Sequence, residues 1–167
     1  MRLVIFSLLL FLNILLFGQD KFEFVPNGGQ LHDNVLYKAD VPSGAVFLET
    51  DGIKYSFYDP SFFNTIHEGG NPGDKIHFHA FKIEFVDALE PVVELKNINE
   101  GLINVFLGND PRKWAEGLKG GGEVYYKGIY DKVDFRIYTR GGSLKYDFII
   151  HPGGSVNDIK LKFNGVD

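Results

Sequence analysis

Two segments of alternating apolar and polar residues, separated by Gly141-Gly142, constrain the fold of this chain more than any other feature. The segments span residues 133–140 and 143–150. A two-residue Gly-Gly loop is typical of a tight β-hairpin, because both glycines can adopt positive φ. The pattern therefore predicts an antiparallel pair of strands with a defined register.

That register gives the hairpin one apolar face and one polar face. The apolar face consists of three cross-strand pairs: Val133–Ile150, Phe135–Phe148 and Ile137–Tyr146. The polar face carries two pairs: Arg136–Asp147 and Tyr138–Lys145. Opposite charges and matched apolar pairs both stabilise antiparallel strands, so we expect one face to be buried and the other solvated.

A second hairpin is predicted around Asp51-Gly52, a dipeptide favoured in type I′ turns. Its strands span residues 45–50 and 53–58. With Asp51-Gly52 as the loop, the predicted cross-strand pairs are Leu48–Tyr55, Val46–Phe57 and Glu49–Lys54.

Further segments read as strands, and turn-forming residues separate them. The additional candidates are Phe22–Val25, Val35–Val41, Ile76–Val86, Leu102–Leu107, Val124–Tyr130 and Ile159–Phe163. One helical turn is expected at residues 111–115, with Asp110 as the N-cap and Pro111 at the first helical position. These spacings predict an all-β fold, an antiparallel β-sandwich, with a barrel-like variant as the alternative.

The first eighteen residues predict export. Arg2 precedes an apolar run from Leu3 to Phe17, which is shorter than the ~20 residues that span a bilayer. The run suits a signal peptide cleaved after Gly18, leaving residues 19–167 as a single domain. An uncleaved membrane anchor is the alternative. We expect the protein at the cell surface or outside the cell, with the periplasm as the alternative, and membrane contact only during export.

Composition excludes several classes of function. The chain has 17 basic and 22 acidic residues, a formal net charge of −5, which argues against a nucleic-acid partner. Its lack of cysteine excludes disulfides, thiol nucleophiles and cysteine-based zinc sites. The sequence contains no P-loop, dinucleotide fingerprint or serine nucleophile elbow, so no enzymatic activity is predicted.

Three histidines are candidate zinc ligands, although we expect no bound cofactor. His77 and His79 share one face of a predicted strand, and His67 precedes them in a glycine-rich loop. The alternative is that a core strand simply emerges into solvent there. Calcium is a second candidate ion, with oxygen ligands from Asp131 and Asp134 and from the more distant Asn109 and Asp110.

Aromatic residues are the candidates for ligand binding. Trp114, Tyr126 and Tyr130 have rings that could stack on a sugar, or that could instead fill the ends of a packed sandwich. The sequence leaves both roles open.

Five segments in a common order resemble a family. They are residues 24–30 (FVPNGGQ), 104–114 (NVFLGNDPRKW), 126–130 (YKGIY) with Asp134, 144–148 (LKYDF) and 151–154 (HPGG). Together they are similar to an N-terminal all-β domain of uncharacterised function in large exported Bacteroidetes surface proteins. Asp131-Lys132 departs from the Pro-Gly of that pattern, and Phe106 replaces a tyrosine.

The resemblance implies a non-catalytic structural or adhesive module. In that family the domain is often followed by propeller-type repeats and by gliding-motility-associated or type IX sorting domains, so the expected partners are downstream domains of the same chain. The strand-like alternation near residue 167 likewise suggests the front portion of a longer polypeptide. The alternatives are a carbohydrate-binding module that recognises extracellular polysaccharide or cell-surface components, and an accessory domain of a secreted hydrolase.

Overall fold

The computed structural model describes residues 22–62 and 75–166, so the predicted signal peptide and His67 lie outside the described residues. Within them the chain forms strands β1 to β12 and two short 3-10 helices, η1 and η2. The strands are β1 (Val25–Pro26), β2 (Val35–Val41), β3 (Gly44–Glu49), β4 (Gly52–Tyr58), β5 (Phe78–Phe85), β6 (Val92–Ile98), β7 (Ile103–Phe106), β8 (Trp114–Leu118), β9 (Gly121–Tyr130), β10 (Val133–Arg140), β11 (Ser143–Ile150) and β12 (Leu161–Asn164). The helices are η1 (Pro111–Lys113) and η2 (Val156–Asp158). None of the described helices is long and apolar enough to cross a membrane.

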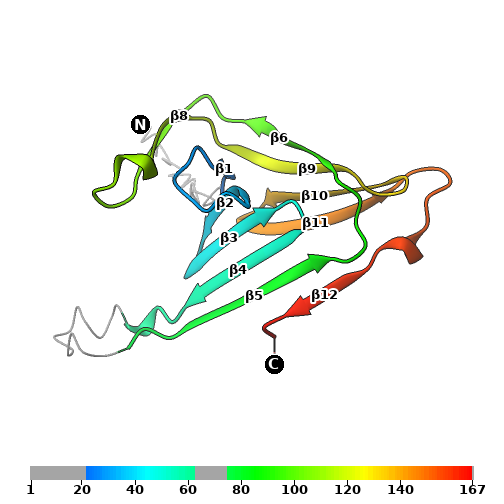
Figure 1. Cartoon of the computed structure of the whole chain (residues 1–167), viewed down its shortest axis with the longest axis horizontal. Coiled ribbons are helices and arrows are strands. Elements are labelled where there is room, and N and C mark those ends of the chain that lie inside the picture. Colours follow the sequence, from blue (N-terminus) through cyan, green and yellow to red (C-terminus); the bar gives the residue numbers. More distant parts are fainter. Residues whose placement is uncertain (1–21, 63–74, 167) are drawn as a thin grey trace, which may run out of the picture.

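Two antiparallel sheets pack face to face (Figure 1). The larger sheet has the strand order β1-β2-β3-β4-β5-β12, and the smaller has the order β11-β10-β9-β6. Strands β7 and β8 form a separate two-stranded sheet beside the sandwich. Both main sheets remain open, so the predicted antiparallel β-sandwich is confirmed and the barrel-like variant is not adopted.

An aromatic cluster joins the two sheets. The ring centroid of Phe85, on the larger sheet, lies near those of three aromatic residues of the smaller sheet. The centroid distances are 5.0 Å to Phe135, 6.0 Å to Tyr126 and 6.4 Å to Phe148. The hydroxyl of Tyr126 also donates to the Glu49 carbonyl oxygen at 3.0 Å. These contacts place the core between β5 and strands β9 to β11.

The hairpin β10–β11 has the predicted register. Phe135 pairs with Phe148 and Arg136 with Asp147, across a turn in which Gly141 and Gly142 have φ of 61° and 70°. The Arg136 guanidinium lies 2.7 Å from the Asp147 carboxylate. Local turn chemistry and cross-strand matching agree here, which explains why the pattern alone was sufficient.

The predicted register of the β3–β4 hairpin is wrong by two residues. Glu49 pairs with Gly52 and Leu48 with Ile53, so the loop is Thr50-Asp51 and Lys54 lies opposite Phe47. Gly52 lacks the positive φ of a type I′ turn and lies inside the strand, where any side chain would collide with the Ile83 carbonyl oxygen of β5. The neighbouring strand, rather than the turn dipeptide, therefore determines this register.

The remaining elements are largely as expected. The candidate Val35–Val41 coincides with β2, and the helical turn is η1, with Asp110 as its N-cap. The glycines at 121 and 122 belong to β9, which begins before the predicted residue 124. Strands β6 and β8 were not predicted. Strand β8 follows η1 directly, and five of the seven β6 residues, at positions 92, 94 and 96–98, are polar or exposed.

Candidate functional site

The loop between β1 and β2 is held by its own side chains. The Asn27 amide donates to the carbonyl oxygens of His32 and Val35, and its oxygen accepts from the backbone N–H groups of Gly29 and Leu31. These four bonds fold residues 27–34 into a compact loop, since an asparagine side chain readily replaces backbone partners in turns.

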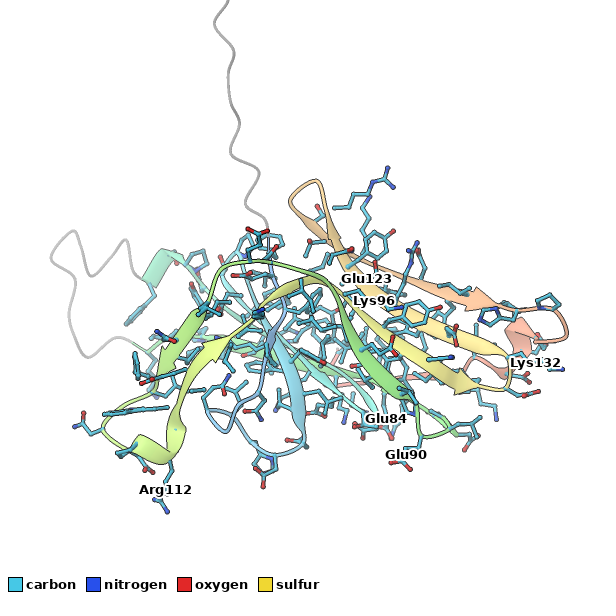
Figure 2. The ribbon with its side chains drawn as sticks, turned by 90° about the horizontal axis from the view of Figure 1, so that it is seen from above. Glu84, Glu90, Lys96, Arg112, Glu123 and Lys132 are labelled. Carbon is cyan, nitrogen blue, oxygen red and sulfur yellow. The ribbon has the colours of Figure 1, made fainter. Side chains whose placement is uncertain are left out.

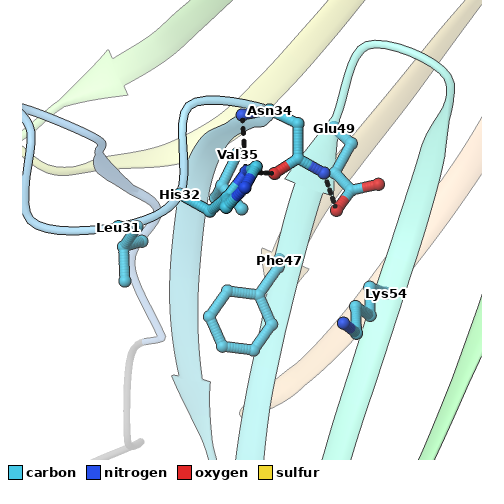
Figure 3. A pocket seen from close by; sticks show the side chains of 7 residues that line it. All are labelled: Leu31, His32, Asn34, Val35, Phe47, Glu49 and Lys54. Atoms are coloured by element: carbon cyan, nitrogen blue, oxygen red, sulfur yellow. Dashed lines mark hydrogen bonds between the residues drawn. The ribbon is translucent and has the colours of Figure 1, made fainter.

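This loop covers one end of β3 and creates a cavity of about 410 Å³ on the outer face of the larger sheet (Figure 3). The residues that line the cavity are Leu31, His32, Asn34, Val35, Phe47, Glu49 and Lys54. Figure 3 shows Phe47 and Lys54 beside each other, with His32, Asn34 and Glu49 grouped at the end of the cavity nearest the loop. The cavity thus combines an aromatic surface with several polar groups, which is typical of small-molecule sites.

Glu49 is the buried charge of this cavity, with 5% of its surface exposed. Its carboxylate accepts from the Asn34 amide and from the Lys82 ammonium, each at 2.7 Å. Lys82 also bonds the Asp51 carboxylate at 2.8 Å. Burial alone would lower the Lys82 pKa, but the bonds to Asp51 and Glu49 raise it above its usual value. The negative charge of Glu49 is therefore compensated by Lys82.

A second cavity of about 660 Å³ adjoins the first. Both cavities are lined by Leu31 and His32, and the second extends to Leu107, Gly108 and Lys113. The last three residues belong to the segment from β7 to η1, which we call the flap (residues 103–118, comprising β7, η1 and β8). The two cavities together connect the flap with the outer face of the larger sheet.

The flap is built by residues of one sequence motif. Asp110 caps η1 through the Arg112 backbone N–H, and Asn104 accepts from the Gly117 backbone N–H at 2.8 Å. Trp114 donates through Nε1 to the Gly108 carbonyl oxygen and packs edge-on against Phe106. In Figure 2 Arg112 points away from the sandwich at the tip of the flap. The motif thus maintains an exposed hairpin outside the core.

A separate polar cluster, around Asp134, lies on the smaller sheet. The Asp134 carboxylate accepts from the Tyr125 hydroxyl and from the Gly128 backbone N–H, both at 2.7 Å, and lies 2.6 Å from His151 Nε2. Burial alone would raise the pKa of Asp134, but the bonds from His151, Tyr125 and Gly128 hold it below its usual value. This carboxylate therefore ties β9, β10 and the segment after β11 together.

The same cluster allows a prediction about the pKa of Tyr125. Burial and the bond to Asp134 raise the pKa of Tyr125 to about 12. Because the folded pKa exceeds the unfolded value, the stability that this tyrosine contributes is complete below pH 10 and is lost as pH rises through 12. In Asp134→Asn we expect its pKa to fall part of the way toward 10, since burial remains.

Phenolate absorbance during a pH titration measures this shift. The Tyr125→Phe variant serves as the assignment control, because burial also raises the pKa of other tyrosines and the variant removes only the contribution of Tyr125. An unchanged transition in Asp134→Asn would show that burial alone sets the Tyr125 pKa.

The structure places the predicted aromatic residues in different environments. Trp114 is 42% exposed, whereas Tyr126 and Tyr130 are buried in the core. The Tyr130 hydroxyl donates to the Lys160 carbonyl oxygen at 2.8 Å. The three rings therefore do not form a common exposed surface, and Trp114 alone of them is available to a ligand.

The predicted metal ligands are not brought together with a third donor in the described residues. His77 and His79 are both exposed at the start of β5, and the His79 ring packs against Phe81 at 5.9 Å. Residues 22–62 and 75–166 contain no group of three or more histidine and carboxylate side chains arranged to hold a metal ion. For calcium, Asp134 is bound within its cluster and Asp110 caps η1.

The cavity residues themselves were not predicted. Glu49 occupies an outward position of an alternating strand, and such a position ordinarily predicts a solvated side chain. Its burial comes from the loop at residues 27–34 and from Lys82, which are distant in the sequence. The one local signal is the run of side chains with hydrogen-bonding capacity, Asn27, Gln30, His32 and Asn34, directly before β2.

Comparison with known proteins gives a family and no closer relative. No curated protein and no solved structure matches the chain. A family model matches residues 24–167, which include the sandwich, the flap and both cavities. The chain therefore belongs to the family described as Domain of unknown function (DUF7948).

Proposed function

We propose that this chain is a non-catalytic, exported module with a structural or adhesive role in a larger cell-surface or secreted bacterial protein. The N-terminal apolar run supports export, and the resemblance to Bacteroidetes surface proteins supports a location on or outside the cell, with transport by the type IX system. Downstream domains of the same chain are its proposed partners.

The observation that carries the adhesive role is the flap. It stands outside the sandwich and exposes large apolar side chains: Leu102 just before β7, and Phe106, Leu107 and Trp114 within the flap. Contiguous exposed apolar groups of this kind are characteristic of interaction surfaces. A hairpin whose capping and turn residues keep it rigid can present such a surface at little conformational cost.

The structural part of the proposal is supported by the two buried carboxylates. Glu49 and Asp134 are the buried acidic side chains in the described residues, and each is bound by several donors from the fold. Carboxylates engaged in this way stabilise the fold through charge-assisted hydrogen bonds. Both are therefore better explained as structural residues than as general acids or bases.

Binding to cell envelopes tests the adhesive role. The purified exported chain is immobilised, and retention of envelope fragments is compared for the wild type, Phe106→Ala and Trp114→Ala. We expect each variant to lose most of the retention, since aromatic residues dominate binding surfaces. Phe78→Ala, which changes a ring that is 66% exposed on β5, is the matched control and should retain the wild-type level. Equal losses in all three variants would contradict a role of the flap.

A further inference from the structure

In the described part of the chain, neither lysine that lines the two adjoining cavities forms a close ion pair, although Lys113 is near enough to Asp110 to lower the pKa of that carboxyl. Lys54 lines the first cavity and Lys113 the second. Among the described residues neither ammonium group has a carboxylate within 4.0 Å. The carboxylate that lines these cavities, Glu49, is bound by Lys82. Lys54 is therefore the cation of the first cavity that has no carboxylate partner within 4.0 Å among the described residues.

The register of the larger sheet places Lys54 in an unfavourable position. The cross-strand row on the outer face runs Lys38–Phe47–Lys54–Lys82. Lys38 and Lys82 have acidic partners, at 2.7 Å each, whereas Lys54 lies directly opposite Lys82. Like charges in directly opposed positions destabilise a sheet. An anion bound beside Lys54 would give this lysine the kind of partner that Lys38 and Lys82 already have.

Phe47 supplies the other half of the site. It lies between the lysines of β2 and β4 in the cross-strand row, and its ring faces the cavity (Figure 3). The Glu49 carboxylate and the polar groups of Asn34 and His32 line the same space, farther along the strands from Phe47 and Lys54. The cavity thus offers an apolar ring surface, a cation beside it and hydrogen-bond acceptors at one end.

We propose that the two cavities bind an acidic polysaccharide built from uronic acid units, an inference that rests on the adhesive function proposed above. One sugar ring packs against Phe47, its carboxylate accepts from Lys54, and its hydroxyl groups donate to Glu49. The polysaccharide continues past Leu31 and His32 toward Lys113.

Calorimetric titration of the exported chain with oligogalacturonate tests this site, with the neutral galactose oligomer of equal length as the reference ligand. We expect measurable affinity for the acidic oligomer alone, weakened by added salt because the Lys54 contact is electrostatic. Lys54→Met should weaken binding at least about tenfold, the value of a hydrogen bond to a charged group. Phe47→Ala should weaken it roughly fivefold through loss of the aromatic contact.

Lys145→Met is the matched control, because Lys145 is exposed on β11 of the other sheet. It should bind as the wild type does. Absence of wild-type binding, equal affinity for the neutral oligomer, or equal losses in Lys145→Met and Lys54→Met would each overturn the inference. Retention of envelope fragments through the flap is a separate readout, so it would still decide the adhesive role if the acidic oligomer did not bind.

Discussion

Replacing Phe135 with alanine is expected to lower the free energy of unfolding by about 3–5 kcal/mol, the largest effect that we predict. The ring is 1% exposed and lies at the centre of the aromatic cluster. Its centroid is 5.0 Å from both Phe85 and Phe148, 5.6 Å from Tyr126 and 5.8 Å from Tyr146. Alanine leaves a cavity between the two sheets that these rings cannot fill without leaving their own positions.

Urea unfolding followed by tryptophan fluorescence or circular dichroism measures this loss. Phe163→Ala is the control, because Phe163 is 51% exposed on the edge strand β12. Its truncation should cost no more than about 1 kcal/mol, since its ring transfers far less apolar surface from water. Comparable losses in the two variants would mean that the aromatic cluster is not the centre of stability.

The second large effect is expected at Lys82. The Lys82→Met variant should lose about 2–3 kcal/mol of unfolding free energy, because Glu49 remains buried without its cation. The loss is below that of a fully buried ion pair, since the Lys82 side chain is 26% exposed and Asn34 still donates to Glu49.

Lys54→Met provides a control with the same chemical change in the directly opposed position. Lys54 is exposed, and removing it also relieves repulsion of Lys82, so its unfolding free energy should stay within about 0.5 kcal/mol of the wild type. If Lys54→Met destabilised as much as Lys82→Met, the compensation of Glu49 by Lys82 would be refuted. The same control shows that any binding defect of Lys54→Met does not arise from unfolding.

The two hairpins show how far local sequence determines this fold. In β10–β11 the glycine pair, the apolar faces and the Arg136–Asp147 match all select one register, and the prediction was correct. In β3–β4 a shift of two residues leaves every side chain on the same face, so the apolar pattern cannot distinguish the two registers. The choice depends on Gly52, which lies against the backbone of the neighbouring strand β5, and a long segment of sequence separates these two strands.

The candidate site was harder to predict for a related reason. Trp114 stood out because it is the single tryptophan, and the structure leaves it exposed on the flap. Phe47, Glu49 and Lys54 carry no motif, and their association depends on the corrected register and on the loop that covers them. Sites assembled from sheet register and a distant loop have no short sequence signature, whereas turns and caps do.

The position of the flap has a mechanical consequence. Strands β7 and β8 are connected to β6 and β9, and β9 is hydrogen-bonded along its length to β10. A pull on the flap tip therefore runs along the axis of β9, and many hydrogen bonds between β9 and β10 resist it at the same time. A module loaded in this direction shears as a unit instead of unzipping bond by bond.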